Sequence, residues 1–143
     1  MKLEIKTNFD FGKMANKLPK VIDKFLNESY AGVVAQDSKK FIESGRVTPQ
    51  LNDSTIEIRK NRKPYVGGSK PLYATGALAN SLSKSKDGLK MKGYGVVHHS
   101  GFTTGSKSMI PNKIVRPRPF LQVDNLPKVL SKFFDALKVA RKK

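Results

Sequence analysis

The longest periodic pattern of hydrophobic residues runs from about Phe11 to Ser44. Apolar side chains recur there at steps of three and four residues, the spacing of an amphipathic helix, at Leu18, Ile22, Phe25, Leu26, Tyr30, Val33, Val34, Phe41 and Ile42. We expect Pro19 to begin the main helix, since a proline in the first turn removes no hydrogen bond. Gly45 follows as a natural stop. The pattern predicts one long helix whose apolar stripe needs a cover.

A second amphipathic pattern lies at the C-terminal end of the chain. We expect Asp124 or Asn125 to cap this helix and Pro127 to lie in its first turn. The apolar stripe consists of Leu126, Val129, Leu130, Phe133, Phe134 and Leu137. Core packing is the default interpretation of this stripe, and two phenylalanines in one turn also suit an oligomer contact.

Shorter patterns between these helices predict a small, mainly antiparallel β-sheet. Asp87-Gly88 stands between two alternating runs, which is typical of a hairpin. Leu82, Leu89 and Met91 would then share the inner face of the hairpin. A basic ribbon would occupy its other face, formed by Lys84, Lys86, Lys90 and Lys92. The fold class that follows is α+β, a single domain over 1–143 with both amphipathic helices packed on the sheet.

The remaining segments give weaker signals. Residues 1–10 alternate like a short strand or an arm, and the short apolar run Tyr94–Gly101 is interpreted as a strand ending in a turn. The run around Thr55–Ile58 alternates like a strand, but Asp53 and Ser54 resemble helix caps, so we favour a short helix. Residues 63–70 are expected to form a mobile loop, and residues 102–112 an interaction loop.

The stretch from Lys70 to Ser83 organises the middle of the chain. Leu72 and Tyr73 are expected to be buried, and Thr75-Gly76 to form a tight turn. Thr75 is a candidate helix cap, while Gly76 permits a positive φ or a close backbone approach. Leu78 and Leu82 would lie on one face of the short helix that follows.

Alternating prolines define the segment Ile114–Leu121, I-V-R-P-R-P-F-L. They fix an extended backbone, so that Arg116 and Arg118 are expected to project on one side while Phe120 and Leu121 anchor the end. One interpretation is an edge segment that leads into the last helix. The other is a rigid contact strap whose arginines bind carboxylates or phosphates of a partner.

Charge changes this picture more than any other feature of the composition. The chain has 28 Lys and Arg against 11 Asp and Glu, a formal net charge of +17. Such a balance indicates an acidic partner, either nucleic acid or a negatively charged protein surface, although spread lysines also serve solubility. Cysteine is absent and no apolar run approaches the roughly 20 residues of a membrane span, so we expect synthesis in the cytosol and no membrane partner.

Residues with catalytic chemistry form no recognisable site. His98 and His99 are adjacent, and on a strand they would point to opposite faces without a third ligand nearby, so a structural role is favoured over metal binding. A dyad of either histidine with Asp87 would lack a nucleophile. We predict no catalytic residue, no metal, no cofactor and no enzymatic activity.

Three segments in order resemble the virion-morphogenesis and tail-completion proteins of tailed phages. They are P-L-Y-A-T-G-A-L-A-N-S-L from Pro71 to Leu82, Y-G-V-V-H-H-S-G from Tyr94 to Gly101, and the proline segment Ile114–Leu121. A fourth run, P-Q-L-N-D-S-T-I from Pro49 to Ile56, resembles another segment of that family and favours a helix there. Gly95 departs from the pattern, because the family often has alanine at this step.

The resemblance implies a non-enzymatic protein that assembles as a ring in the neck of the virion, through which DNA passes. Implied partners are copies of itself, an adjacent neck or connector ring and tail tube proteins, with non-specific DNA contact in the channel. Candidate interface residues are Tyr73, Thr75, Gly76, Arg116, Arg118, Phe120 and Leu121. The alternatives are a tail terminator of the same family, or a standalone basic nucleic-acid-binding protein.

Overall fold

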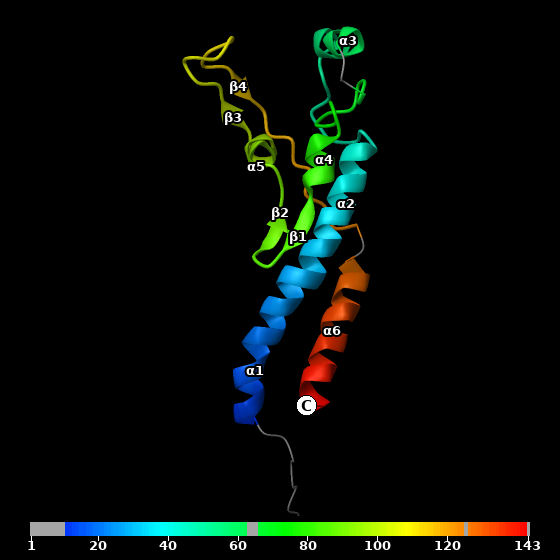
Figure 1. The fold of residues 1–143 in the computed structure, drawn as a ribbon, viewed down its shortest axis with the longest axis vertical. Helices are drawn as coiled ribbons and strands as arrows, with labels where there is room; N and C mark the ends of the chain where they lie inside the picture. Colours follow the sequence, from blue (N-terminus) through cyan, green and yellow to red (C-terminus); the bar gives the residue numbers. More distant parts are fainter. Residues whose placement is uncertain (1–10, 63–65, 125, 143) are drawn as a thin grey trace, which may run out of the picture.

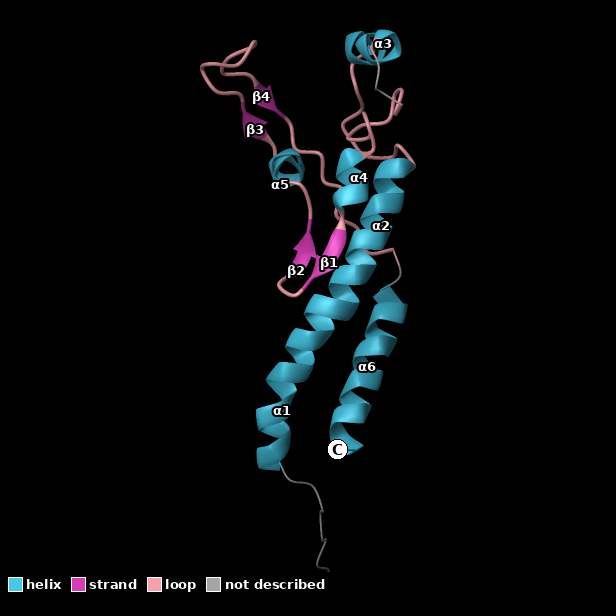
Figure 2. Ribbon diagram, in the orientation of Figure 1, coloured by secondary structure: helices cyan, strands magenta, loops and turns pink. Residues whose placement is uncertain are grey.

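The structure is a computed structural model that describes residues 11–62, 66–124 and 126–142. Helices α1, η1 and α2 run end to end along the longest axis of the molecule (Figure 1). Two small strand pairs lie on one side of α2, and α6 lies beside α1 (Figure 2). The α+β class and the long N-terminal and C-terminal helices expected from the sequence are confirmed.

The long helix consists of α1 (Phe11–Lys24), the π-helical η1 (Phe25–Tyr30) and α2 (Ala31–Glu43). Lys24 and Ala31 flank η1 and keep right-handed helical torsions, so the helix does not break at either junction. Gly45 ends it as expected, with a φ of 75° and its N–H donated to the carbonyl of Ile42.

The position of Pro19 corrects the sequence-based expectation. Pro19 lies inside α1, and the helix has already begun at Phe11. A proline inside a helix costs a hydrogen bond, but tertiary packing can offset that cost. Here α1 packs along α6 (Leu126–Lys142).

Helix α6 packs on other helices rather than on a sheet. It runs antiparallel to α1 and contacts α1 and η1 (Figure 1). The rings of Phe25 and Phe133 lie 4.9 Å apart between centroids, and Val129 is buried. The sequence pattern identified the apolar stripe of α6, but the expected cover, a β-sheet, is wrong. The strands are too short to cover a long helix, and α1 and η1 cover part of the stripe instead.

The main core lies where α2 meets α4 (Ala77–Ser81) and the strands that follow. Its buried members are Ala35, Ile42, Val47, Leu78, Ala79, Leu82 and Phe120. Leu78 and Leu82 are both buried, as their spacing predicted, while Leu72 and Tyr73 are only half-buried at its edge. This core fixes α4 and the strands after it against α2, the C-terminal part of the long helix.

The strands form two separate sheets instead of one. β1 (Ser83–Ser85) pairs antiparallel with β2 (Gly88–Lys90), and β3 (Phe102–Thr103) pairs antiparallel with β4 (Ile114–Val115). The predicted hairpin at Asp87-Gly88 is confirmed, with Ser85 opposite Gly88.

Two short helices complete the fold. The helix favoured over a strand near Thr55 is confirmed as α3 (Asp53–Asn61), although the N-cap is Asn52 rather than Asp53 or Ser54. The segment interpreted as a strand is instead α5 (Gly93–Ser100). Gly95, His98 and His99 face inward at helical spacing. The prediction of a strand was wrong because so short a run does not reveal a helical period. The alternating residues 1–10 lie outside the described residues, as do residues 63–65 of the predicted loop.

Candidate functional site

A cleft of about 470 Å³ opens beside α4, between α3 and α5. It is lined by Leu51, Thr55, Arg59, Leu72, Ala74, Thr75, Ala77, Leu78, Tyr94, His98 and Arg118. All four segments that carry the resemblance to tail-completion proteins contribute to this lining, although they are spread from residue 49 to residue 121. The fold therefore gathers these motifs at one place, which no single motif indicated.

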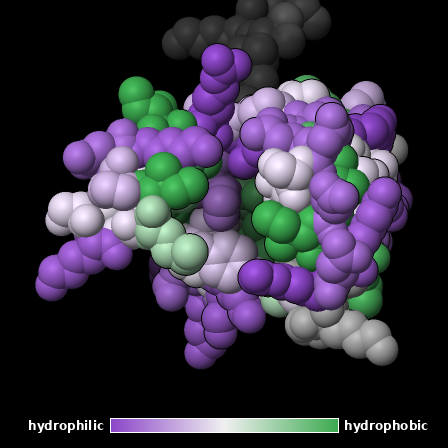
Figure 3. All heavy atoms as spheres, turned by 90° about the horizontal axis from the view of Figure 1, so that it is seen from above, coloured by the Kyte–Doolittle hydropathy of each residue, from purple (hydrophilic) through white to green (hydrophobic). Residues whose placement is uncertain are grey.

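The surface around this end of the molecule is mostly hydrophilic. Seen from above, hydrophobic residues form small separate patches around a hollow (Figure 3). The cleft itself has leucine and alanine side chains in its walls, with the guanidinium groups of Arg59 and Arg118 as its charged groups. No aspartate or glutamate contributes to this lining. Its electrostatic character is positive.

Arg118 is held firmly in the wall of the cleft. Its Nε donates to the carbonyl of Pro49 at 3.0 Å, and its backbone N–H donates to the carbonyl of His98 at 2.8 Å. Arg59 has a structural role as well, because its Nη1 donates to the carbonyl of Lys70 at 2.8 Å. The proline-rich segment thus fixes one guanidinium, as a rigid strap would.

His98 stands beside Arg118 in the same wall. Its ring makes edge-on contacts with Tyr94, at 6.2 Å between centroids, and with Phe102, at 5.4 Å. Its Nδ1 is buried and has no hydrogen-bond partner among the described residues. Burial, together with the positive charge of Arg118, lowers the pKa of His98 below its ordinary 6.5. Near neutral pH this imidazole is uncharged.

His99 has a structural partner, and it connects α5 to the core. Its Nδ1 accepts a hydrogen bond of 3.2 Å from the backbone N–H of Phe120, and the two rings meet edge-on. In the described part of the chain, no three His, Asp or Glu side chains gather where they could hold a metal ion.

Phe120 corrects one of the interface candidates. Its side chain has an exposed fraction of 0%, within the core. Leu121 beside it is half-buried against the same core, whereas Arg116 is exposed. Phe120 was expected to anchor the end of a contact strap, but the segment crosses the core of its own chain.

The turn before α4 behaves largely as expected. Gly76 is buried, has a φ of 75° and occupies the N-cap position itself. Thr75 lies one residue earlier, is exposed, and accepts the N–H of Ala77 at 3.4 Å. The half-buried ring of Tyr73 closes over Gly76, where an added Cβ would lie 3.4 Å from it. Of these candidates, Thr75 is therefore the accessible one.

The predicted basic ribbon is wrong. Lys84 pairs with Leu89 and Ser83 pairs with Lys90, and directly paired residues share a face of the hairpin. Lys84 therefore shares the face of Leu89, with its stem against Gly32 of α2, and Lys90 lies on the opposite face. The error is one of parity, because Lys84 stands two residues after the inward-facing Leu82.

The predicted interaction loop is the tip of a small arm. β3 and β4 form its base, and hydrogen bonds from the N–H groups of Asn112 and Lys113 to Thr104 close the loop between them. Met109 and Ile110 at the tip are exposed, and Ile114 follows at the base with an exposed fraction of 76%. The arm presents apolar side chains to solvent away from the core.

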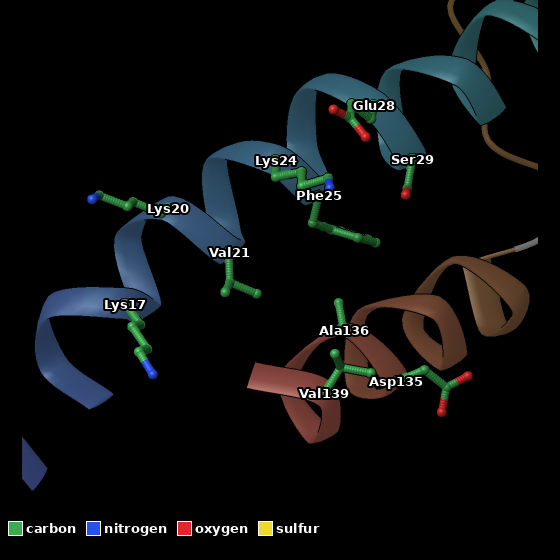
Figure 4. A pocket seen from close by; sticks show the side chains of 10 residues that line it. All are labelled: Lys17, Lys20, Val21, Lys24, Phe25, Glu28, Ser29, Asp135, Ala136 and Val139. Atoms are coloured by element: carbon green, nitrogen blue, oxygen red, sulfur yellow. The ribbon is translucent and has the colours of Figure 1, made fainter. Parts of the chain in front are cut away.

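A second hollow, of about 620 Å³, lies between α1 and α6 (Figure 4). Val21 and Phe25 on one side face Ala136 and Val139 on the other, and Lys17, Lys20 and Lys24 lie along the α1 side. Glu28 and Asp135 add acidic groups at its rim. Of these four apolar residues, the predicted amphipathic stripes included only Phe25, and the stripes did not indicate a gap between the helices. No helix in the described residues has both the length and the apolar content to cross a bilayer.

Comparison of the chain with known protein families, with curated proteins and with solved structures finds no match.

Proposed function

We propose that this chain is a structural protein of a tailed-phage virion that acts in tail completion or head–tail joining. In this proposal copies of the chain assemble as a ring in the neck, through which DNA passes. The observation that carries the proposal is the convergence of the four motif segments on one cleft. Function is argued from a site rather than from a fold, and this cleft is a site to which all four segments contribute.

The distribution of exposed apolar residues supports a protein that works by contact. The arm presents Met109 and Ile110, while α6 presents the row Leu126, Leu130 and Phe134 away from the core. Such residues at different ends of one molecule suit head-to-tail contacts, which close into a ring when the rotation between copies allows it.

The net charge of +17 supports acidic partners around this ring. The proposed partners are other copies of the chain, an adjacent neck or connector ring and tail tube proteins. Lysines of the hairpin lie on both of its faces, so they form no single track for nucleic acid. We therefore assign most of the charge to protein contacts and to weak, non-specific contact with DNA in the channel.

The same net charge favours one second candidate, a standalone nucleic-acid-binding protein. Such proteins interleave aromatic side chains with a basic groove. The hairpin lysines have no aromatic residue between them in the sequence, which favours the virion protein. A tail terminator of the same family would use the same contacts at a different level of the tail.

Electron microscopy of particles made without this gene tests the proposal. The proposal predicts DNA-filled heads separate from finished tails, and plasmid-borne wild-type protein should restore joined particles. Overlong tails would instead assign the tail-terminator role. Intact infectious particles would contradict the proposal and favour the nucleic-acid-binding alternative.

A further inference from the structure

The cleft beside α4 contains an unpaired cation. In the part of the chain that the structure describes, Arg118 has no carboxylate partner. Its Nε donates a hydrogen bond to the carbonyl of Pro49, and its two Nη atoms have no acceptor among these residues. A half-buried guanidinium is normally paired, because taking a charge out of water is unfavourable.

A second polar group in the same cleft also lacks a partner. The Nδ1 of His98 is buried without a hydrogen bond, which is uncommon for a buried polar atom. Tyr94 and Phe102 hold the ring edge-on, and the backbone bond between Arg118 and the His98 carbonyl keeps both residues together. The backbone hydrogen bond therefore holds Arg118 and His98 together in the wall of the cleft before any ligand binds.

The shape and chemistry of the cleft select the class of ligand. A guanidinium matches a carboxylate with two parallel hydrogen bonds. The adjoining wall is apolar, with Leu72 and Leu78 in the lining, so the occupant should carry an apolar group next to the acid. A nucleic-acid backbone offers a charged, hydrated surface instead of such a pair, and it fits a recessed apolar cleft poorly.

We propose that this cleft binds an aspartate or glutamate, flanked by an apolar residue, on a short segment of a partner protein. Arg118 pairs with the carboxylate, and the flanking side chain lies against Leu72 and Leu78. Only the identity of the partner, a neighbouring copy or an adjacent ring, rests on the proposed function. The binding chemistry itself is a property of the isolated chain.

The test is a titration of the isotopically labelled full chain, followed by nuclear magnetic resonance. The probe is the capped dipeptide acetyl-Leu-Asp-amide, and the matched control is acetyl-Leu-Asn-amide. We expect saturable shifts at Leu78, His98 and Arg118, and binding at least roughly tenfold weaker for the asparagine dipeptide, which loses the charged hydrogen bonds. The bound carboxylate should also raise the pKa of His98, because it cancels the positive charge of Arg118.

Two variants make the test specific to Arg118. Arg118→Gln should lose the preference for the aspartate dipeptide, whereas Arg46→Gln, which removes the same charge at an exposed residue outside the cleft, should retain it. If Arg118→Gln does not fold, the competition between the two dipeptides on the wild-type chain still decides the question.

Equal binding of the two dipeptides would overturn the proposal, and so would the absence of any saturable shift. Preferential shifts of the same resonances by a single-stranded oligothymidylate or by inorganic phosphate would overturn it in favour of a phosphate site. Absence of the chain from virions would contradict the proposed function and leave this binding result standing.

Discussion

Two halves of the molecule bury their apolar residues to different extents: the upper half, around α2 and α4, and the lower half, formed by α1, η1 and α6. Around α2 and α4, the side chains of Ile42, Leu78 and Phe120 have exposed fractions of 0–1%. Where α6 packs on α1 and η1, Phe25 and Val129 are buried, but Phe134 and Val139 of α6 are each 56% exposed. The upper half forms its own core, and the lower half leaves apolar surface open beside a hollow of about 620 Å³.

This difference separates two kinds of interface. The upper half holds a preformed cleft in rigid walls, where a partner needs to supply only a few groups. The lower half presents exposed hydrophobic residues on one layer of helices, a surface that a neighbouring subunit can cover. Variants that affect one half and spare the other test whether the division is real.

Phe120→Ala should have the largest effect on stability. Removing a fully buried phenylalanine from the core should cost about 3–5 kcal/mol of unfolding free energy. Phe134→Ala removes the same side chain from the exposed face of α6 and should cost less than about 1 kcal/mol. Urea denaturation of both variants measures the difference. Similar losses in the two variants would show that the halves are packed alike.

Gly95→Ala should have the next largest effect. A Cβ at this position would lie 2.7 Å from Cδ1 of Leu78 and 3.0 Å from the sulfur of Met91. Overpacking costs about 1–3 kcal/mol, of which the better helix propensity of alanine returns up to about 1 kcal/mol. Thermal and urea denaturation should therefore show a net loss of stability.

Gly93→Ala in the same helix is the matched control. Nothing lies within 4 Å of the added Cβ there, so this variant should be neutral or slightly more stable than wild type. A stabilising Gly95→Ala variant would mean that the wall between α5 and α4 is looser than the structure shows.

The protonation of His98 should have a smaller effect on stability, confined to the cleft. Its pKa should lie below 6.5, because burial and the charge of Arg118 disfavour the imidazolium. The folded state then binds fewer protons than the unfolded state, so the contribution of His98 to stability is full above about pH 6.5 and falls as the pH decreases.

Nuclear magnetic resonance of the ring protons gives the pKa of His98 directly. Arg118→Gln should raise it, since one of the two causes of the shift is removed. A wild-type pKa at or above 6.5 would contradict the closed, positively charged environment described for the cleft.

Leu130→Gln combined with Phe134→Gln should have the smallest effect on stability, within about 1 kcal/mol for two exposed positions. The same double variant should nevertheless reduce incorporation into particles, because it removes the proposed contact face of α6. Complementation of the gene deletion measures incorporation, and Lys90→Gln on the exposed edge of the hairpin serves as the control. Full incorporation of a stable double variant would remove α6 from the set of interfaces.

Local signals in the sequence were sufficient for much of the fold. Helical spacing identified the long helix and α6, and Gly45, Gly76 and the Asp87-Gly88 turn have the roles expected of them. These features depend on neighbours within a few residues. Pro19 was misassigned because tertiary packing overrode a local preference, and α5 because so short a run did not reveal its helical period.

The site was harder to predict than the fold. The cleft depends on contacts between segments far apart in sequence, such as the bond between Arg118 and Pro49, and no periodicity encodes them. Phe120 was placed at an interface for the same reason, although it lies in the core. Each motif was visible in the sequence, but the sequence did not indicate that Arg118, Thr75 and His98 line one cavity.

A cryo-electron microscopy reconstruction of the neck of purified particles tests the central claim most directly. We expect a ring of copies of this chain, with apolar surface of α6 covered and an acidic side chain of a neighbour opposite Arg118. Particles whose neck contains no copy of the chain would contradict it.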